Sequence, residues 1–182
     1  MGNSYQPEYK TNPKRLKLKG IGYFGHYAFV ILILSPFLLT IIEYIKYLNG
    51  TYKGLRPMNE LFEGTSIFIF LALILLLIQI RRLKFKTLET NISEESIINL
   101  CTKFAKVNNL EVKHVTKNEF VATSNGFLSF GTWGEMITVI IIDNIVYINS
   151  ICDPYKRPNI VSLGKNKAYR NALKKTIINA SA

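Results

Sequence analysis

Residues 67–78 read Ile-Phe-Ile-Phe-Leu-Ala-Leu-Ile-Leu-Leu-Leu-Ile, and Arg81-Arg82 follow almost at once. The apolar block that contains this stretch extends from about Leu61 to Ile80. Twenty residues of α-helix rise about 30 Å, which is the thickness of the hydrocarbon core of a bilayer. We therefore predict a transmembrane helix over about residues 60–81.

A second apolar block lies closer to the N-terminus. Residues 23–42 read Tyr-Phe-Gly-His-Tyr-Ala-Phe-Val-Ile-Leu-Ile-Leu-Ser-Pro-Phe-Leu-Leu-Thr-Ile-Ile and carry no formal charge. The block is too long for the core of a signal peptide, and no convincing cleavage site follows it. We predict a span over about residues 22–45, so that residues 21–82 form a transmembrane helical hairpin.

Pro36 lies inside the first predicted span. Proline has no backbone N–H, so the helical partner of the Leu32 carbonyl is missing and the helix should kink. We expect Ser35 or Thr40 to satisfy the disturbed backbone. A kink at a transport pathway is the alternative to one that serves packing.

Ionisable residues are absent from the middle of both predicted spans. His26 and Glu43 lie near the ends of the first span, and Gln79 lies near the end of the second. Ion and proton pathways are usually marked by ionisable residues inside the membrane. The two spans are therefore typical of an anchor, although an oligomeric pore stays open as an alternative.

The chain is basic, with 23 Lys and Arg against 12 Asp and Glu and a formal net charge of +11. Such a charge can indicate nucleic-acid binding, but nine cations flank the predicted spans. They are Lys10, Lys14, Arg15, Lys17 and Lys19 before the first span, and Arg81, Arg82, Lys84 and Lys86 after the second. By the positive-inside rule, both clusters face the cytoplasm. We expect the lipid bilayer as a partner and no nucleic acid.

The predicted organisation has three parts: a basic N-terminal arm (1–20), the transmembrane hairpin (21–82) and a cytoplasmic domain (83–182). We expect an integral membrane protein with both termini cytoplasmic. The fold class is α+β, with the hairpin followed by a small antiparallel sheet and helices packed on one face.

The elements of the cytoplasmic domain follow from its periodicity. Ser93 is a good N-cap, Glu94 and Glu95 suit the start of a helix, and Asn108-Asn109 can end it, so we predict a helix over about 94–108. A closing amphipathic helix is expected over about 166–178. The predicted strands are 83–90, 110–116, 119–123, 127–130, 136–142 and 145–151.

Two turns and two buried runs refine this sheet. Asn125-Gly126 is a strong hairpin signal, and Asp143-Asn144 predicts a second turn. The runs Val139–Ile142 and Ile145-Val146 are continuously apolar. Such runs are typical of central strands that are buried on both faces or against another chain.

No set of residues predicts catalysis, a cofactor or a metal. There is no phosphate-binding glycine loop and no zinc-protease or nucleophile-elbow motif. Cys101 and Cys152 lack metal-ligand spacing and are expected to be buried free thiols in a reducing compartment. A cysteine–histidine nucleophile pair could combine His114 with either Cys101 or Cys152. Cys152, beside a turn, is the better candidate, but a structural role is the preferred interpretation.

The acidic residues of the domain are scattered along the chain. We interpret Asp143 as a turn residue, and Glu135, Asp143 and Asp153 are too far apart in sequence to argue for magnesium. Whether the chain is an enzyme is left open, with a non-enzymatic role favoured.

The most specific pattern is Gly131-Thr-Trp-Gly-Glu-Met-Ile137, then Ile148-Asn-Ser-Ile-Cys-Asp-Pro154 and Ser162-Leu-Gly-Lys-Asn166. It resembles a group of small two-span bacterial membrane proteins of the Bacteroidetes type. These share a Trp-Gly-Glu turn, a Ser-x-x-Asp-Pro strand end and a Gly-x-Asn helix start. The resemblance covers the last 95 residues or so. It implies a bacterial origin, and hence the bacterial inner membrane as the location, but no activity.

The residues predicted to contact a partner or lipid are one aromatic and a set of cations, namely Trp133, Lys165, Lys167, Arg170 and Lys174. Trp133 either caps the sheet or anchors a partner. The cations form either a solvated helix face or a surface for anionic lipid.

These features predict a membrane-anchored cytoplasmic domain that binds or regulates a protein partner without catalysis. A membrane-bound immunity or defence protein and an anionic-lipid-sensing domain are the alternatives. Homo-oligomerisation also stays open.

Overall fold

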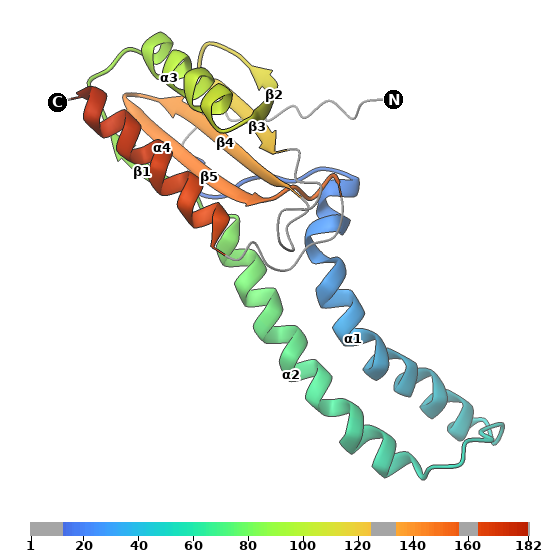
Figure 1. Cartoon of the computed structure of the whole chain (residues 1–182). Helices are drawn as coiled ribbons and strands as arrows, with labels where there is room; N and C mark the ends of the chain where they lie inside the picture. The colour runs from blue at the N-terminus through green and yellow to red at the C-terminus, as the bar shows by residue number, and fades with distance from the viewer. Residues whose placement is uncertain (1–12, 125–133, 157–163, 182) are drawn as a thin grey trace. The chain divides into compact units, whose positions relative to one another are not determined.

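The computed structural model describes residues 13–124, 134–156 and 164–181 (Figure 1). They divide into two compact units. One unit runs from His26 to Arg81, and the other combines the described residues up to Gly25 with those from Arg82 onward. The predicted strand 127–130, the Asn125-Gly126 turn and Trp133 lie outside the described residues.

The first unit consists almost entirely of two helices, α1 (Ile21–Leu48) and α2 (Met58–Arg82). They contain the predicted spans and extend them by a few residues, and both are long and apolar enough to cross a membrane. Only 11% and 6% of their most apolar windows are buried, whereas a core helix of a soluble protein would be mostly covered. Leu32 and Phe70, for example, are 60% and 61% exposed.

Side-chain hydroxyl groups satisfy the backbone around Pro36. The Ser35 hydroxyl donates a hydrogen bond of 2.7 Å to the carbonyl of Leu32, the group that proline leaves without a helical partner. The Thr40 hydroxyl lies 3.1 Å from the Pro36 carbonyl oxygen and 3.1 Å from the hydroxyl of Thr65 on α2. The prediction that Ser35 or Thr40 satisfies the disturbed backbone is therefore confirmed for Ser35.

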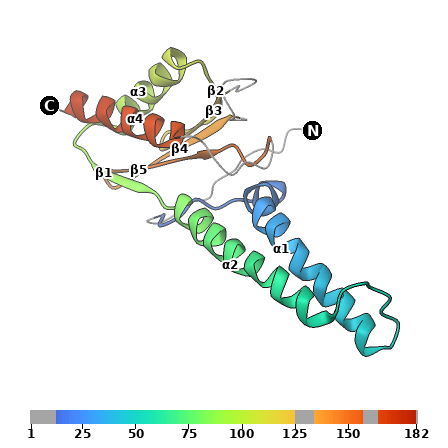
Figure 2. The ribbon, with the colours of Figure 1, turned by 60° about the horizontal axis from the view of Figure 1, so that its bottom comes forward.

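The second unit is built on a five-stranded antiparallel sheet. Its strands are β1 (Lys86–Glu89), β2 (Leu110–Val115), β3 (Glu119–Ser124), β4 (Glu135–Ile142) and β5 (Ile145–Cys152). Their spatial order is β1-β5-β4-β3-β2. Helices α3 (Glu94–Val107) and α4 (Lys165–Ser181) cover one face of the sheet, as Figures 1 and 2 both show. The predicted α+β class is confirmed.

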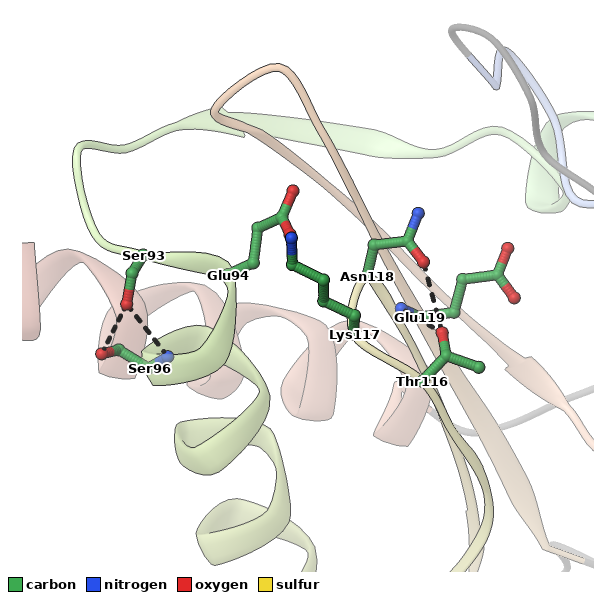
Figure 3. A network of polar contacts seen from close by, with 7 residues as sticks. All are labelled: Ser93, Glu94, Ser96, Thr116, Lys117, Asn118 and Glu119. Carbon is green, nitrogen blue, oxygen red and sulfur yellow. Dashed lines mark hydrogen bonds and ion pairs between the residues drawn. The ribbon is translucent and has the colours of Figure 1, made fainter.

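Helix α3 begins and ends as its sequence predicts. The Ser93 hydroxyl accepts a hydrogen bond of 3.3 Å from the backbone N–H of Ser96, which is N-cap geometry (Figure 3). Asn109, after the last turn, has a φ of 53°, the left-handed conformation that commonly follows a helix.

Figure 3 also shows the turn between β2 and β3 beside the start of α3. The Glu119 backbone N–H donates 3.0 Å to the Thr116 hydroxyl, which closes the turn. Lys117 extends from the turn to Glu94, with an N–O distance of 3.5 Å. Because the Lys117 side chain is well exposed, this ion pair contributes little to stability.

The core lies between the helices and one face of the sheet. Its fully buried members include Ile97, Cys101, Phe120, Val139, Ile148, Leu173 and Ile177. Strands β4 and β5 are buried along nearly their whole length, with Met136, Ile140, Tyr147 and Ile151 buried on the face opposite the helices. This confirms that the apolar runs form central strands buried on both faces.

Special backbone conformations occur at the ends of β4. Asp143 and Asn144 have φ values of 50° and 63°, and together they form the two-residue connection to β5. A two-residue hairpin connection of this kind suits the twist of the flanking strands. Gly134 has a φ of 111°, and a Cβ there would lie 2.7 Å from the carbonyl oxygen of Ser124, so this position requires glycine.

The N-terminal arm pairs with the segment that links α2 to β1. The Leu16 N–H donates a hydrogen bond of 2.7 Å to the Leu83 carbonyl. The Phe85 N–H donates one of 3.4 Å to the Lys14 carbonyl. The buried Asn149 amide on β5 donates to the carbonyls of Arg82 and Lys84, at 2.9 and 3.0 Å. The exit from α2 is therefore hydrogen-bonded to both the arm and the sheet.

We expect Asn149→Ala to lower the free energy of unfolding by about 1–2 kcal/mol, because the carbonyls of Arg82 and Lys84 lose the donor that the buried Asn149 amide supplies. Thermal unfolding of the full chain in detergent micelles measures this effect. Asn179→Ala, at an exposed asparagine of α4, is the matched control and should leave the transition unchanged. Equal transitions for both variants would show that the amide does not hold the exit of α2.

Candidate functional site

A groove of about 310 Å³ lies between the edge strand β1 and helix α4. Its lining residues are Lys86, Thr87, Ile148, Arg170, Asn171 and Lys174. We call it the cationic groove, because three of its six lining residues are cations and none is acidic. Both walls belong to the same compact unit.

Strand register and helical spacing bring the three cations together. Lys86 pairs with Ile148 across β1 and β5, and paired residues of a sheet point to the same face. Since Ile148 belongs to the core beneath the helices, Lys86 is on the helix-covered face. Arg170 and Lys174 are four residues apart on α4 and therefore neighbours on its surface.

No acidic side chain neutralises these cations within the described part of the chain. Neither Lys86, Arg170 nor Lys174 forms an ion pair with any described residue. Like charges that share one hollow repel each other, and an anion in the hollow relieves that repulsion. The arrangement is thus suited to hold an anionic group, with Ile148 as an apolar floor.

The structure brings together only part of the predicted contact set. Arg170 and Lys174 line the groove, whereas Lys165 and Lys167 do not. Trp133 is outside the described residues. Sequence reasoning missed Lys86 as a site residue, because it was interpreted only as a cation flanking a span. The available signal was its spacing of two residues from the apolar Leu88, which puts both side chains on the same face of β1.

A second polar cluster lies where β3 and β4 meet. The Glu135 side chain is 2% exposed, and its carboxylate accepts a hydrogen bond of 2.6 Å from the Ser124 hydroxyl. The same hydroxyl accepts a hydrogen bond of 2.7 Å from the backbone N–H of Glu135. The Lys156 ammonium group donates 2.9 Å to the Ser124 carbonyl. These bonds connect strand ends to one another, so we interpret the cluster as structural.

The two cysteines are in environments that suppress nucleophilic chemistry. Cys101 is fully buried in the core, and this burial raises its pKa to about 12. Burial also raises the pKa of Cys152, and this effect outweighs the opposing hydrogen bond from Asn166. A thiol is reactive as the thiolate. Both cysteines therefore conform to the predicted interpretation as buried free thiols.

The cysteine–histidine pair considered from sequence is not assembled. His114 lies on β2 and Cys152 on β5, with β3 and β4 between them. Three interstrand steps amount to about 14 Å, far beyond hydrogen-bond distance. The partner near His114 is instead the Glu119 carboxylate, at 3.7 Å.

The three carboxylates considered from sequence for a metal site do not come together. Asp143 lies in the turn between β4 and β5, at the opposite end of that hairpin from Glu135 and Asp153. Among the residues that the structure describes, no group of three His, Cys, Asp or Glu side chains is placed to hold a metal ion.

In comparisons with known proteins, neither a protein-family model, nor a curated protein, nor a solved structure matches this chain. The resemblance to two-span bacterial proteins stays a prediction.

We expect both native thiols to resist maleimide at pH 8 in the folded chain and to react after denaturation. A thiol with a pKa of about 12 is ionised there to roughly one part in ten thousand. Because both pKa values are raised, labelling should stay slow up to pH 9, where an ordinary thiol is largely ionised. Labelling rates followed by mass spectrometry measure this.

The matched control is Asn179→Cys, which places a thiol on the exposed face of α4 and should react at once. If native Cys152 reacted as fast as this control, the interpretation of Cys152 as a structural thiol would be wrong.

Proposed function

We propose that this chain is an integral membrane protein whose sheet domain is a non-enzymatic binding or regulatory module held at the cytoplasmic face of the bilayer. The observation that carries the proposal is the exposed apolar surface of α1 and α2, with only residues 83–85 between the end of α2 and strand β1. Such an apolar surface is stable in the hydrocarbon core of a bilayer.

Hydrogen bonds between the two ends of the hairpin support the proposal that both ends lie on the same side of the bilayer. The arm before α1 and the link after α2 pair with each other through Leu16, Leu83, Lys14 and Phe85. A chain that crosses a bilayer twice returns to its starting side, so this pairing agrees with two crossings. The cations of these two segments favour the cytoplasmic side.

The chemistry of the domain favours binding over catalysis. Its thiols are buried, His114 is separated from Cys152 by two strands, and the Glu135 cluster connects strand ends. The cationic groove, by contrast, presents three charges that no described acidic residue offsets. Regulation through an anionic ligand or an acidic protein surface is the function that this arrangement supports best.

We expect the full chain to stay in the membrane pellet after alkaline carbonate extraction, because two spans hold it in lipid. In intact cells, a membrane-impermeant maleimide should label Lys53→Cys, in the loop between α1 and α2. It should label Asn179→Cys on α4 only after permeabilisation. Gel-shift detection of labelled chain measures both reactions, and the buried native thiols leave a low background.

Two outcomes would contradict the proposal. Release of the chain by carbonate would argue against membrane insertion. Labelling of Asn179→Cys in intact cells, with Lys53→Cys protected, would place the sheet domain outside the cytoplasm.

A further inference from the structure

We propose that the cationic groove between β1 and α4 binds the phosphate group of an anionic glycerophospholipid in the leaflet nearest the domain. This inference rests on the proposed membrane anchoring and assigns the ligand class of the domain. It commits to one source of phosphate, the lipid headgroup.

The charge and shape of the groove match such a headgroup. Lys86 approaches from the strand, and Arg170 and Lys174 approach from the helix, so a phosphate between them would meet cations from two sides. Guanidinium and ammonium groups are the side chains that bind phosphate oxygens best. Asn171 adds an amide group that suits the hydroxyls of a glycerol headgroup.

The volume of the groove argues for a small ligand. At about 310 Å³ it is at the lower end of the range for small-molecule sites, which begins near 300 Å³. That space accommodates one phosphate with a short polar group. A nucleic-acid strand would need a groove that follows several consecutive phosphates.

The covalent chain keeps the groove near the end of α2. Lys86 follows Arg82, the last residue of α2, by four residues. Four residues span at most about 14 Å, even when fully extended. If α2 crosses the bilayer, Lys86 cannot be far from the headgroup layer. The phosphate of a lipid can therefore reach Lys86 while the lipid stays in its leaflet.

The test uses the full chain, purified in an uncharged maltoside detergent. Native mass spectrometry measures the binding of dioleoylphosphatidylglycerol and dioleoylphosphatidylcholine, added together at equal concentration. We expect one phosphatidylglycerol to bind with at least tenfold preference. The triple variant Lys86→Gln/Arg170→Gln/Lys174→Gln should lose this preference, since each cation near an anionic lipid accounts for about a fivefold change in affinity.

The matched control removes the same charge elsewhere. Lys103→Gln/Lys106→Gln/Lys175→Gln changes three exposed lysines that do not line the groove, and it should retain the preference. Arg170→Lys, which keeps the charge, should also retain most of it. Thermal unfolding of each variant verifies that the fold is intact, and the side chains of the groove cations reach its surface, so their replacement should be tolerated.

Four outcomes would overturn the inference. The first is an equal loss in both triple variants, which would assign the preference to net charge. The second is unchanged binding by the groove variant. The third is displacement of the lipid by inorganic phosphate at equal concentration, which would indicate a free anion. The fourth is tighter binding of a short single-stranded RNA. Carbonate extraction of the same variants is independent of the groove, so failure of the anchor and failure of the site are distinguishable.

Discussion

The backbone between Arg82 and Lys86 has to change from a helix to a strand without leaving buried polar groups unpaired. A helix end exposes carbonyls, and an edge strand exposes both donors and acceptors. Here the arm supplies partners on one side, through Leu16 and Lys14, and the Asn149 amide supplies them on the other. This junction sets where β1 enters the sheet, at the edge beside β5.

The position of β1 in turn determines the candidate site. As an edge strand, β1 leaves its helix-covered side only partly filled, since α4 packs through Leu173 and Ile177 toward the centre of the sheet. The space that remains receives Lys86 from the strand and Arg170 and Lys174 from the helix. The groove is thus a consequence of how a helix covers the margin of a sheet, with cations where the core ends.

Local signals were sufficient for most elements of the fold. Ser93 marks the start of α3 and Asn109 follows its end, as their chemistry predicts. Asp143-Asn144 form the hairpin turn, and the apolar runs are the buried centres of β4 and β5. The site was only half predictable. Arg170 and Lys174 share a helix face within a few residues, but Lys86 lies more than 80 positions earlier, and nothing local to it indicates that strand β5 and helix α4 lie beside it.

By itself, the sequence determined the two apolar helices, the α+β class and the absence of recognisable catalytic motifs. These follow from periodicity, composition and turn chemistry, which act over a few neighbouring residues. Only the tertiary structure decided the strand order β1-β5-β4-β3-β2, the separation of Cys152 from His114, and the meeting of Lys86 with α4. Those outcomes depend on which distant surfaces bury each other, and burial is a property of the assembled core rather than of any local segment.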